Sequence, residues 1–368
     1  MRIGIDARIA HYSGGGIRNY VVHLLESLAE LDGDGDYCIL HSRKDDTFSS
    51  LDGSFRSVAC WTPSHHRLER WTLSVEIARL GLELLHSPDF IPPTFGYDRS
   101  VITVHDLNFL YYPRFLTAES RRYYNGQIEW AVEHADHILA DSHATEADLT
   151  SLLDVAPDKV TVVHLAADPS FRPVPEAAAR QTAASYDLEP GFLLFVGTLE
   201  PRKNVPGLLL AYRIVLDEKV TNEPLVLVGG KGWLYEEIFD RVEALDLENH
   251  VHFVHGVPDA DLPGLYSAAS VLAMPSFYEG FGLPALEAMS CGTPVVVADR
   301  ASLPEVVGDA GQLIDPEDPG DIAGALKRVL TDESERERMR EAGLKQAEAF
   351  SWTRVARETR AVYEELLT

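Results

Sequence analysis

Residues Ser276–Gly292 read S-F-Y-E-G-F-G-L-P-A-L-E-A-M-S-C-G, which predicts a glycine-flanked turn followed by a short helix. Pro284 suits the first position of that helix, because its missing N–H would have no intrahelical partner there in any case. Gly292 can take a positive φ and, with the Thr-Pro that follows, marks the end of the helix. The turn carries few bulky side chains, so we expect the helix N-terminus to be open to a ligand.

Two glutamates flank the start of this helix. Glu279 lies in the turn before it, and Glu287 lies about one turn into it. Between them, the backbone N–H groups of Phe281, Gly282 and Leu283 are expected at the positive end of the helix dipole, where anions bind. A phosphate next to two hydroxyl acceptors describes a nucleotide sugar. The segment therefore predicts a nucleotide-sugar site.

The pattern E-G-F-G-L-P-x-L-E resembles the signature of retaining glycosyltransferases of family 4, a group with the GT-B fold. Two glutamates alone would be explained by acids that favour the helix dipole. The functional interpretation is favoured because four further positions match in register: Gly280, Gly282, Pro284 and Gly292. The resemblance implies that Glu279 accepts hexose hydroxyls, that Glu287 accepts ribose hydroxyls, and that the amides between them bind phosphate.

A second match is G-T-L-E-P-R-K-N at Gly197–Asn204, which follows a buried strand and resembles the family's G-x-x-x-x-R-K-N. Arg202 and Lys203 are predicted to enter the next helix, where cations oppose the dipole and need a compensating anion. Arg can bind phosphate oxygens as a fork, and Lys supplies a mobile point charge. The resemblance implies that both stabilise a departing diphosphate in place of a metal ion, with Thr198 among the donor-binding residues.

A glycine run, Gly14–Gly16, follows the first predicted strand and leads into a helix. Either it is a flexible connection, or it lets a ligand approach the backbone at a helix N-terminus. It does not match the dinucleotide fingerprint G-x-G-x-x-G, because Asn19 stands where the last glycine belongs. The family resemblance implies that Gly15 and Gly16 approach the diphosphate and the transferred sugar.

His105 stands at the carboxyl end of the predicted strand Val101–His105, where ligands gather in open α/β sheets. A single histidine in an apolar context is often a satisfied structural group. The resemblance to the family's T-x-H-D implies instead that His105 contacts the transferred hexose. Asp106 either orients His105 or caps the next turn.

The resemblance places base recognition at the segment His255–Asp259, which includes Val257. Recognition there uses mainly backbone groups, so guanine and uracil are not distinguished by the sequence. Aromatic and basic residues also gather at His65–Trp71 and at Asn108–Tyr112. These two segments are open to three interpretations: sugar stacking for an acceptor, contact with membrane headgroups, or ordinary surface amphipathicity. The acceptor-binding residues are not predicted.

Short apolar runs alternate with helical patterns along the whole chain, which predicts parallel, doubly wound sheets. With the resemblance, this implies the GT-B fold: two Rossmann-like α/β domains that face a central cleft. The expected N-terminal acceptor domain covers residues 1–172, and the expected nucleotide-sugar donor domain covers residues 187–350. The last helix, about 352–368, is expected to pack back on the first domain. The proline-rich Asp168–Pro175 is interpreted as the exit from the first sheet.

Composition excludes several classes. The 368 residues are 45% apolar and 24% charged, with a formal net charge of -26, which disfavours nucleic-acid binding. No stretch approaches the ~20 apolar residues of a membrane span, and the N-terminus runs directly into a strand pattern, so we expect a cytoplasmic protein, with peripheral contact at the inner face of the membrane as an open alternative. Three cysteines without C-x-x-C spacing indicate neither disulfides nor zinc.

The resemblance implies a retaining glycosyltransferase without metal or other cofactor, which moves a hexose from a nucleotide diphosphate sugar to a saccharide or lipid-linked saccharide. The segments His86–Pro93 and Ala140–Thr145 look most like mannosyltransferases of lipopolysaccharide O-chain and other surface-glycan assembly. GDP-mannose is therefore the preferred donor and UDP-glucose the alternative. Oligomeric state is not predicted.

Proteins of other classes share the GT-B architecture. A sugar-nucleotide epimerase is expected to lack the paired glutamates, and a phosphorylase needs a cofactor-lysine motif that the sequence does not show. A non-catalytic nucleotide-sugar binder is expected to have lost at least one of four residues that this chain retains: His105, Arg202, Lys203 and Glu279.

Overall fold

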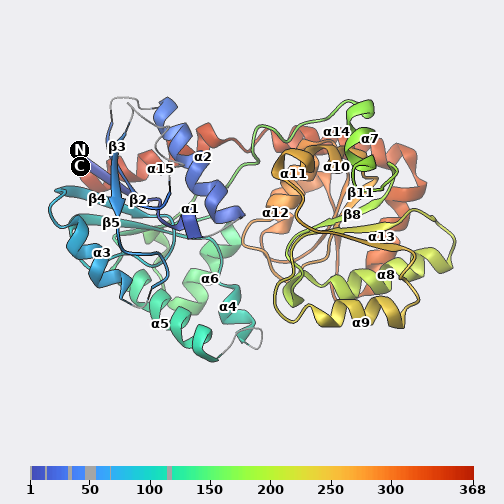
Figure 1. Cartoon of the computed structure of the whole chain (residues 1–368), viewed down its shortest axis with the longest axis horizontal. Helices are drawn as coiled ribbons and strands as arrows, with labels where there is room; N and C mark the ends of the chain where they lie inside the picture. The colour runs from blue at the N-terminus through green and yellow to red at the C-terminus, as the bar shows by residue number, and fades with distance from the viewer. Residues whose placement is uncertain (1, 13–14, 32–34, 46–54, 67, 114–117) are drawn as a thin grey trace. The chain divides into compact units, whose positions relative to one another are not determined.

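The computed structural model describes residues 2–12, 15–31, 35–45, 55–66, 68–113 and 118–368, with the backbone alone at 118–123. Gly14 and Arg67, both part of the patterns above, lie outside the described residues. The chain divides into two compact units, Met1–Ala166 with Ser351–Thr368, and Ala167–Phe350 (Figure 1). None of the described helices combines the length and the apolar composition needed to cross a bilayer.

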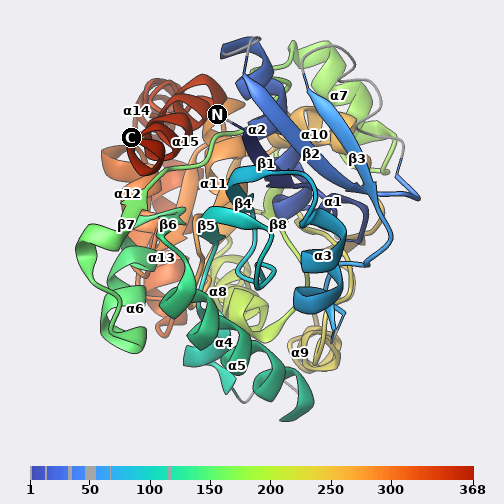
Figure 2. The same cartoon turned by 90° about the vertical axis from the view of Figure 1, so that its left-hand side faces the viewer.

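The first unit contains a seven-stranded, fully parallel sheet with the order β3-β2-β1-β4-β5-β6-β7. Figure 2 faces this unit, with β2 and β3 on one side of β1 and β5 to β7 on the other. The order reverses between β1 and β4, as in doubly wound folds. The strands are β1 (Arg2–Asp6), β2 (Asp36–Ser42), β3 (Arg56–Cys60), β4 (Leu82–Ser87), β5 (Tyr97–Val104), β6 (His137–Ala140) and β7 (Val160–Val162).

Helices accompany this sheet, and the C-terminal helix is one of them. They are α1 (Ile9–Tyr12), α2 (Gly16–Leu31), α3 (Glu69–Ile77), α4 (Asn108–Tyr111), α5 (Ala118–His134), α6 (His143–Leu153) and α15 (Trp352–Leu367). Helix α15 packs against α2 and contacts β4 and β5. Its Tyr363 hydroxyl lies 2.6 Å from Nδ1 of the buried His86. This bond ties the end of the chain to the first sheet.

The second unit contains a six-stranded parallel sheet with the order β10-β9-β8-β11-β12-β13. Its strands are β8 (Leu193–Val196), β9 (Leu225–Val228), β10 (Val251–Val254), β11 (Val271–Met274), β12 (Val295–Ala298) and β13 (Gln312–Ile314). Every residue of β9, β11 and β12 is buried, which matches their continuous apolar runs. The order reverses between β8 and β11.

Eight helices of the second unit are described, together with a 3-10 turn, η4 (Pro201–Lys203). The helices are α7 (Glu176–Ala184), α8 (Val205–Asp217), α9 (Glu236–Ala244), α10 (Leu262–Ala268), α11 (Leu283–Ser290), α12 (Leu303–Val307), α13 (Pro319–Thr331) and α14 (Glu333–Ala347). Two doubly wound parallel sheets, one in each unit, are the α/β architecture that the sequence predicts.

The first domain is expected to extend to residue 172, whereas the structure assigns Ala167 onward to the second unit. The segment interpreted as a connection is packed there. The amide of Val174 donates to Oγ of Ser267 over 3.1 Å, and the ring of Phe171 lies 5.8 Å from that of Tyr266. Helix α7 then packs closely on α10. The three prolines of this segment mark a turn, but they do not show which unit the turn joins.

Candidate active site

The candidate site of the second unit lies where its strand order reverses. Strands β8 and β11 are hydrogen-bonded neighbours, so the loops that follow them start side by side at the carboxyl edge of the sheet. Ligands bind at this position in open α/β sheets. A main-chain bond of 2.8 Å from Phe277 N–H to the Arg202 carbonyl joins the two loops.

Arg202 and Lys203 lie in the 3-10 turn η4, not in the next helix as the sequence predicts. Helix α8 begins only at Val205, because Asn204 takes a left-handed conformation (φ 53°) and its side chain accepts from the Gly207 amide. This cap marks the end of the loop after β8 and the start of the helix. The two cations are therefore fixed in the loop after β8, ahead of the helix N-terminus.

Glu279 is the compensating anion for both cations. Nζ of Lys203 lies 2.7 and 2.9 Å from the two carboxylate oxygens, and Nη1 of Arg202 donates to Oε2 over 2.8 Å. The side chains of Lys203 and Glu279 are only 8% and 7% exposed. Burial alone would raise the pKa of Glu279, but the charges of Lys203 and Arg202 lower it to about 2. Glu279 is therefore ionised at neutral pH.

A fourth charged group, Glu200, completes this ion cluster. One of its carboxylate oxygens lies 2.5 Å from Nε of Arg202, and its side chain is 3% exposed. Burial raises the pKa of Glu200, and the charges of Arg202 and Lys203 act in the opposite direction. Two carboxylates thus balance two cations. Glu200 is not among the predicted site residues, although it stands two residues before Arg202 in the same motif.

Helix α11 begins one residue earlier than predicted, so Pro284 occupies its second position and Leu283 its first. Gly282 is the N-terminal flanking residue, with φ 106°, and a Cβ there would lie 2.6 Å from Cδ2 of Leu303. Glycine is therefore required by both backbone and packing. Within the described residues, the amides of Gly282 and Leu283 have no protein hydrogen-bond acceptor. They are the open donors of a helix N-terminus.

Phe281 precedes this N-terminus and is buried, with its ring 5.8 Å from that of Phe350. Behind it, Oγ of Ser302 lies 2.8 Å from the Glu279 carbonyl oxygen and 2.7 Å from that of Phe281. These contacts fix the backbone between the ion cluster and α11. The backbone of the turn is consequently anchored by hydrogen bonds from Ser302 of the same unit.

Glu287 does not join the ion cluster. It is half-buried on α11, and its carboxylate accepts a 2.7 Å hydrogen bond from the hydroxyl of Tyr266 on α10. Burial raises the pKa of Glu287 to about 7, with Asp259 and Asp168 acting in the same direction. No sequence pattern points to Tyr266, because its pairing with Glu287 arises only when α10 packs against α11.

Two further residues expected to contact the donor lie on loops at the same edge of the sheet. Thr198 is exposed after β8, and Val257 is half-exposed after β10. Gly256, just before Val257, takes φ 67° and opens the turn there. Parallel strands place both loops at the edge that carries the ion cluster.

In the first unit, His105 follows β5 and is held by two acceptors. Nδ1 lies 2.7 Å from Oδ2 of Asp141, and Nε2 lies 3.1 Å from the Pro88 carbonyl oxygen. Each ring nitrogen faces an acceptor, which favours the doubly protonated imidazolium. Burial lowers the pKa of His105, but Asp141 and then Asp89 raise it to about 9. His105 thus carries a positive charge at neutral pH.

Asp141, rather than Asp106, is the partner of His105. Asp106 accepts from the amide and the side chain of Asn108 over 3.0 and 2.6 Å, so it caps the start of α4. Of the two alternatives left open by the sequence, capping is therefore observed. Asp141 follows β6, the strand beside β5. It can be identified as the partner of His105 only from the pairing of these two strands.

The glycines of the first loop keep the conformational freedom that the sequence indicates. Gly15 takes φ 82°, is exposed, and has no heavy atom within 4 Å of the position where a Cβ would stand. Gly16 is the first residue of α2, and the Gly15 carbonyl accepts from the Asn19 amide over 3.1 Å. The start of α2 is thus free of bulky side chains at these two positions.

The aromatic segments of the first unit separate into core and surface. Phe109 is buried and packs on Phe90 and Tyr124, with ring centroids 5.7 and 5.8 Å apart. His65 is bound through Nε2 to Asp89 over 2.6 Å, whereas Trp71 is 62% exposed. Core packing therefore accounts for Phe109 in the segment Asn108–Tyr112, and Trp71 lies on the surface.

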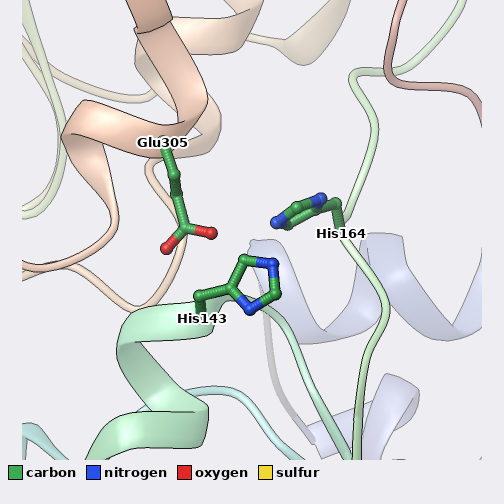
Figure 3. A group of neighbouring side chains, drawn as sticks. All are labelled: His143, His164 and Glu305. Carbon is green, nitrogen blue, oxygen red and sulfur yellow. The ribbon is translucent and has the colours of Figure 1, made fainter.

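A pair of histidines lies elsewhere in the first unit. His143, the first residue of α6, and His164, which follows β7, have ring centroids 5.6 Å apart (Figure 3). Nδ1 of His143 lies 2.9 Å from a carboxylate oxygen of Glu146. The third side chain in that figure, Glu305, belongs to α12 in the second unit. Within the first unit, two imidazoles supply fewer ligands than the three of a catalytic zinc site.

The fold defines the class of protein. Sucrose-phosphate synthase from Thermosynechococcus elongatus superposes with a TM-score of 0.81 at 24% identity, over 100% of this chain and 99% of that one. HepE from Anabaena, solved in complex with UDP-glucose, superposes with a TM-score of 0.78 at 17% identity, over 99% and 100% of the two chains. Together with the two doubly wound sheets, these likenesses show the GT-B fold.

Sequence comparison then gives the family. The family described as Glycosyl transferases group 1 matches residues 181–346, and the one described as Glycosyltransferase Family 4 matches residues 14–171. The O-antigen chain mannosyltransferase B of Escherichia coli is 38% identical over 282 residues, which are 76% of this chain and 74% of that protein. The chain therefore belongs to the glycosyltransferases of group 1 and family 4, as the glutamate signature predicts.

Proposed function

We propose that this glycosyltransferase transfers mannose from GDP-mannose to a saccharide or lipid-linked saccharide, with retention of the anomeric configuration and without a metal ion. The ion cluster of Arg202, Lys203, Glu279 and Glu200 at the strand reversal carries this proposal. The choice of mannose is supported by the similarity to the O-antigen mannosyltransferase.

The second unit binds the donor in this proposal. Arg202 and Lys203 bind the diphosphate, assisted by the amides of the Phe281, Gly282 and Leu283 turn. Two donors in that turn are the open amides at the start of α11. Thr198 lies beside the same diphosphate, and Val257 lies beside the base.

The two glutamates take different parts of the donor. Glu279 is ionised and, besides its contacts to Lys203 and Arg202, keeps acceptor capacity for hexose hydroxyls, since a carboxylate offers about four lone-pair sites. Glu287 accepts the ribose hydroxyls, and the Tyr266 hydroxyl holds its carboxylate in place. The carboxylate that binds the hexose is thus also the one that positions both cations.

The reaction breaks the bond between C1 of the hexose and the diphosphate oxygen, and the electron pair leaves with the nucleoside diphosphate. Arg202 and Lys203 stabilise the negative charge that develops on the departing oxygens, as fixed donors do in other enzymes. The acceptor hydroxyl attacks C1 from the same face. Its proton passes to the departing phosphate oxygen, which balances the charge.

The proposal gives three residues of the first unit a role toward the hexose and the diphosphate. His105 is held as an imidazolium by Asp141 and contacts the hexose. Gly15 and Gly16 approach the sugar and the diphosphate through their backbone. These assignments follow from the family signature in the sequence.

UDP-glucose is the alternative donor, because HepE was solved with UDP-glucose on the same fold. The test is to incubate the full-length protein with GDP-mannose, UDP-glucose, UDP-galactose or ADP-glucose and a mannose-terminated oligosaccharide. Release of the nucleoside diphosphate is measured, and the anomeric configuration of the product is determined by NMR. Mannosyl transfer with retention from GDP-mannose supports the proposal. Turnover of UDP-glucose alone would identify UDP-glucose as the donor in place of GDP-mannose. An inverted product contradicts the mechanism.

A further inference from the structure

The outward face of α3 carries several exposed apolar side chains. The exposed positions on and next to this helix are Leu68, Trp71, Thr72, Val75, Ala78 and Arg79. Three of them are large apolar side chains: Leu68 is 57% exposed, Trp71 62% and Val75 69%. Their spacing of three and four residues places them on one side of the helix. Among these described exposed positions none is acidic, in a chain with 58 acidic residues.

Trp61 extends this apolar face. Trp61 is 71% exposed, and its backbone is tied to α3 because the Glu76 carboxylate accepts from the amides of Trp61 and Thr62 over 2.7 and 2.8 Å. The guanidinium of Arg43 lies 3.6 Å from the centroid of the Trp61 ring. Four exposed apolar side chains therefore lie on or beside one helix. We define the α3 face as Trp61, Leu68, Trp71 and Val75.

Around the α3 face, basic side chains are exposed, whereas the two carboxylates of α3 bind other groups of the unit. Arg43, Lys44 and Arg79 are exposed and basic. The carboxylate of Glu69 is turned into the unit, where it binds Arg8 over 2.7 Å, and that of Glu76 accepts the two amides named above. The face thus presents basic charge to a partner, although the chain as a whole carries a net charge of -26.

We propose that the α3 face docks the protein on the surface of an anionic phospholipid bilayer. Indole rings favour the boundary between headgroups and acyl chains, and neighbouring Arg and Lys side chains are attracted to anionic lipid. A helix with one apolar side lies in that boundary plane and inserts only its apolar side chains. The basic residues Arg43, Lys44 and Arg79 are complementary to anionic lipid, whereas a second copy docked through the same face would bring like charges together.

Docking through the α3 face does not depend on the donor that the enzyme uses. It would bring the enzyme to the membrane with α3 at the lipid surface. The four apolar side chains of the α3 face contact the acyl boundary. Arg43, Lys44 and Arg79 contact phosphate groups.

The test is co-sedimentation of the full-length protein with vesicles of phosphatidylcholine alone or with added phosphatidylglycerol. We expect binding to the phosphatidylglycerol vesicles, and at least tenfold weaker binding for the Trp71→Ser/Val75→Ser variant. The matched control is Trp233→Ser, which removes a 42% exposed tryptophan from the second unit and is expected to bind like wild type. The variant Arg43→Ser/Arg79→Ser is expected to lose the preference for anionic lipid.

Thermal unfolding of each variant shows whether it is folded, and both substituted α3 positions are solvent-exposed. Sedimentation velocity without vesicles distinguishes the other occupants of the face. Failure of the wild-type protein to bind anionic vesicles overturns the proposal. So does equal binding by wild type and Trp71→Ser/Val75→Ser, or a wild-type dimer that this variant dissociates. A change of donor specificity leaves these outcomes unaffected.

Discussion

Lys203 is almost entirely removed from water, and Glu279 is the group that makes this burial tolerable. Burial lowers the pKa of Lys203, while the carboxylate beside it acts in the opposite direction. Arg202 shares the same carboxylate, and Glu200 binds Arg202 from its other side. Each charge in the ion cluster therefore depends on the others, so single substitutions are expected to cost stability as well as activity.

Replacement of Glu279 by Gln is the sharpest perturbation of this cluster, because it leaves Lys203 buried without a carboxylate. We expect a loss of roughly 3–5 kcal/mol in the free energy of unfolding, as for other broken buried ion pairs. Urea denaturation monitored by circular dichroism measures it. The double variant Glu279→Gln/Lys203→Met is expected to recover part of the loss. A Glu279→Gln protein as stable as wild type would contradict the pairing.

The protonation of His105 is predicted to depend on Asp141. The pKa of His105 in the folded protein is about 9, above the usual value of ~6.5. The charged ring therefore contributes stability that is fully present below about pH 6.5 and is lost as the pH rises through 9. Asp141→Asn should lower this pKa, as measured by NMR titration of the His105 ring protons. The prediction fails when both proteins give the same titration midpoint.

At the residue scale, short motifs predict His105 and Glu287 as candidates but not their hydrogen-bond partners. Asp141 and Tyr266 contact His105 and Glu287 only because neighbouring strands or helices bring them together. Sequence spacing carries no trace of such contacts. The position of the two cations was also predicted wrongly, because the left-handed Asn204 that delays α8 is not distinguishable from a helical residue in the motif.

At the element scale, the parallel register of the second sheet brings the loop after β9 against the loop after β8. Gly229 takes φ 154°, and a Cβ there would stand 2.0 Å from the Gly197 carbonyl oxygen. A Cβ at Gly197 would in turn lie 3.6 Å from Cε of Lys203. The close approach of two glycine loops thus supports the loop that carries both cations.

Gly229→Ala is predicted to displace the loop after β8 and with it Lys203. We expect destabilisation by about 3 kcal/mol or more, because the clash is with backbone and the backbone conformation disfavours a side chain. Transfer activity should fall along with stability. The matched control is Gly230→Ala, whose added Cβ meets no heavy atom within 4 Å. Unfolding midpoints and transfer rates of the two variants provide the comparison. Equal values would show that a Cβ at Gly229 does not displace the loop after β8.

Most elements could be predicted because their residues are buried on both faces or recur at helical spacing. The apolar runs of β9 and β11 identify them without ambiguity. Strand β3 has no clear sequence signal, because four of its five residues are at least partly exposed at the sheet edge. The short helices α1, α4 and α12 have none either, since four or five residues show no clear period.

At the scale of the whole molecule, the chain builds two similar sheets and returns to the first with α15. This arrangement is predictable from two consecutive series of alternating strands and helices. The boundary between the units is less predictable, because it depends on where the segment after Ala166 packs. In the proposed mechanism, Arg202 and Lys203 of the second unit take the place of a metal ion.

Transfer by the full-length protein is predicted to be insensitive to chelators. In the proposed mechanism, Arg202 and Lys203 stabilise the departing diphosphate, so we expect that step to need no Mg²⁺ or Mn²⁺. Initial rates with and without EDTA, and after addition of Mg²⁺ or Mn²⁺, provide the measurement. A rate that disappears with EDTA and returns with one of these ions would require a metal in the reaction.

Binding of GDP compared with guanosine, measured by calorimetry on the full-length protein, tests the role of the ion cluster most directly. We predict that wild type binds GDP far more tightly than guanosine, and that Lys203→Ala weakens GDP binding roughly thirtyfold or more without changing guanosine binding. The exposed, ion-paired Lys327 supplies the control variant Lys327→Ala, which should bind GDP like wild type. A folded Lys203→Ala protein that binds GDP as tightly as wild type would contradict the assignment of the ion cluster to the diphosphate.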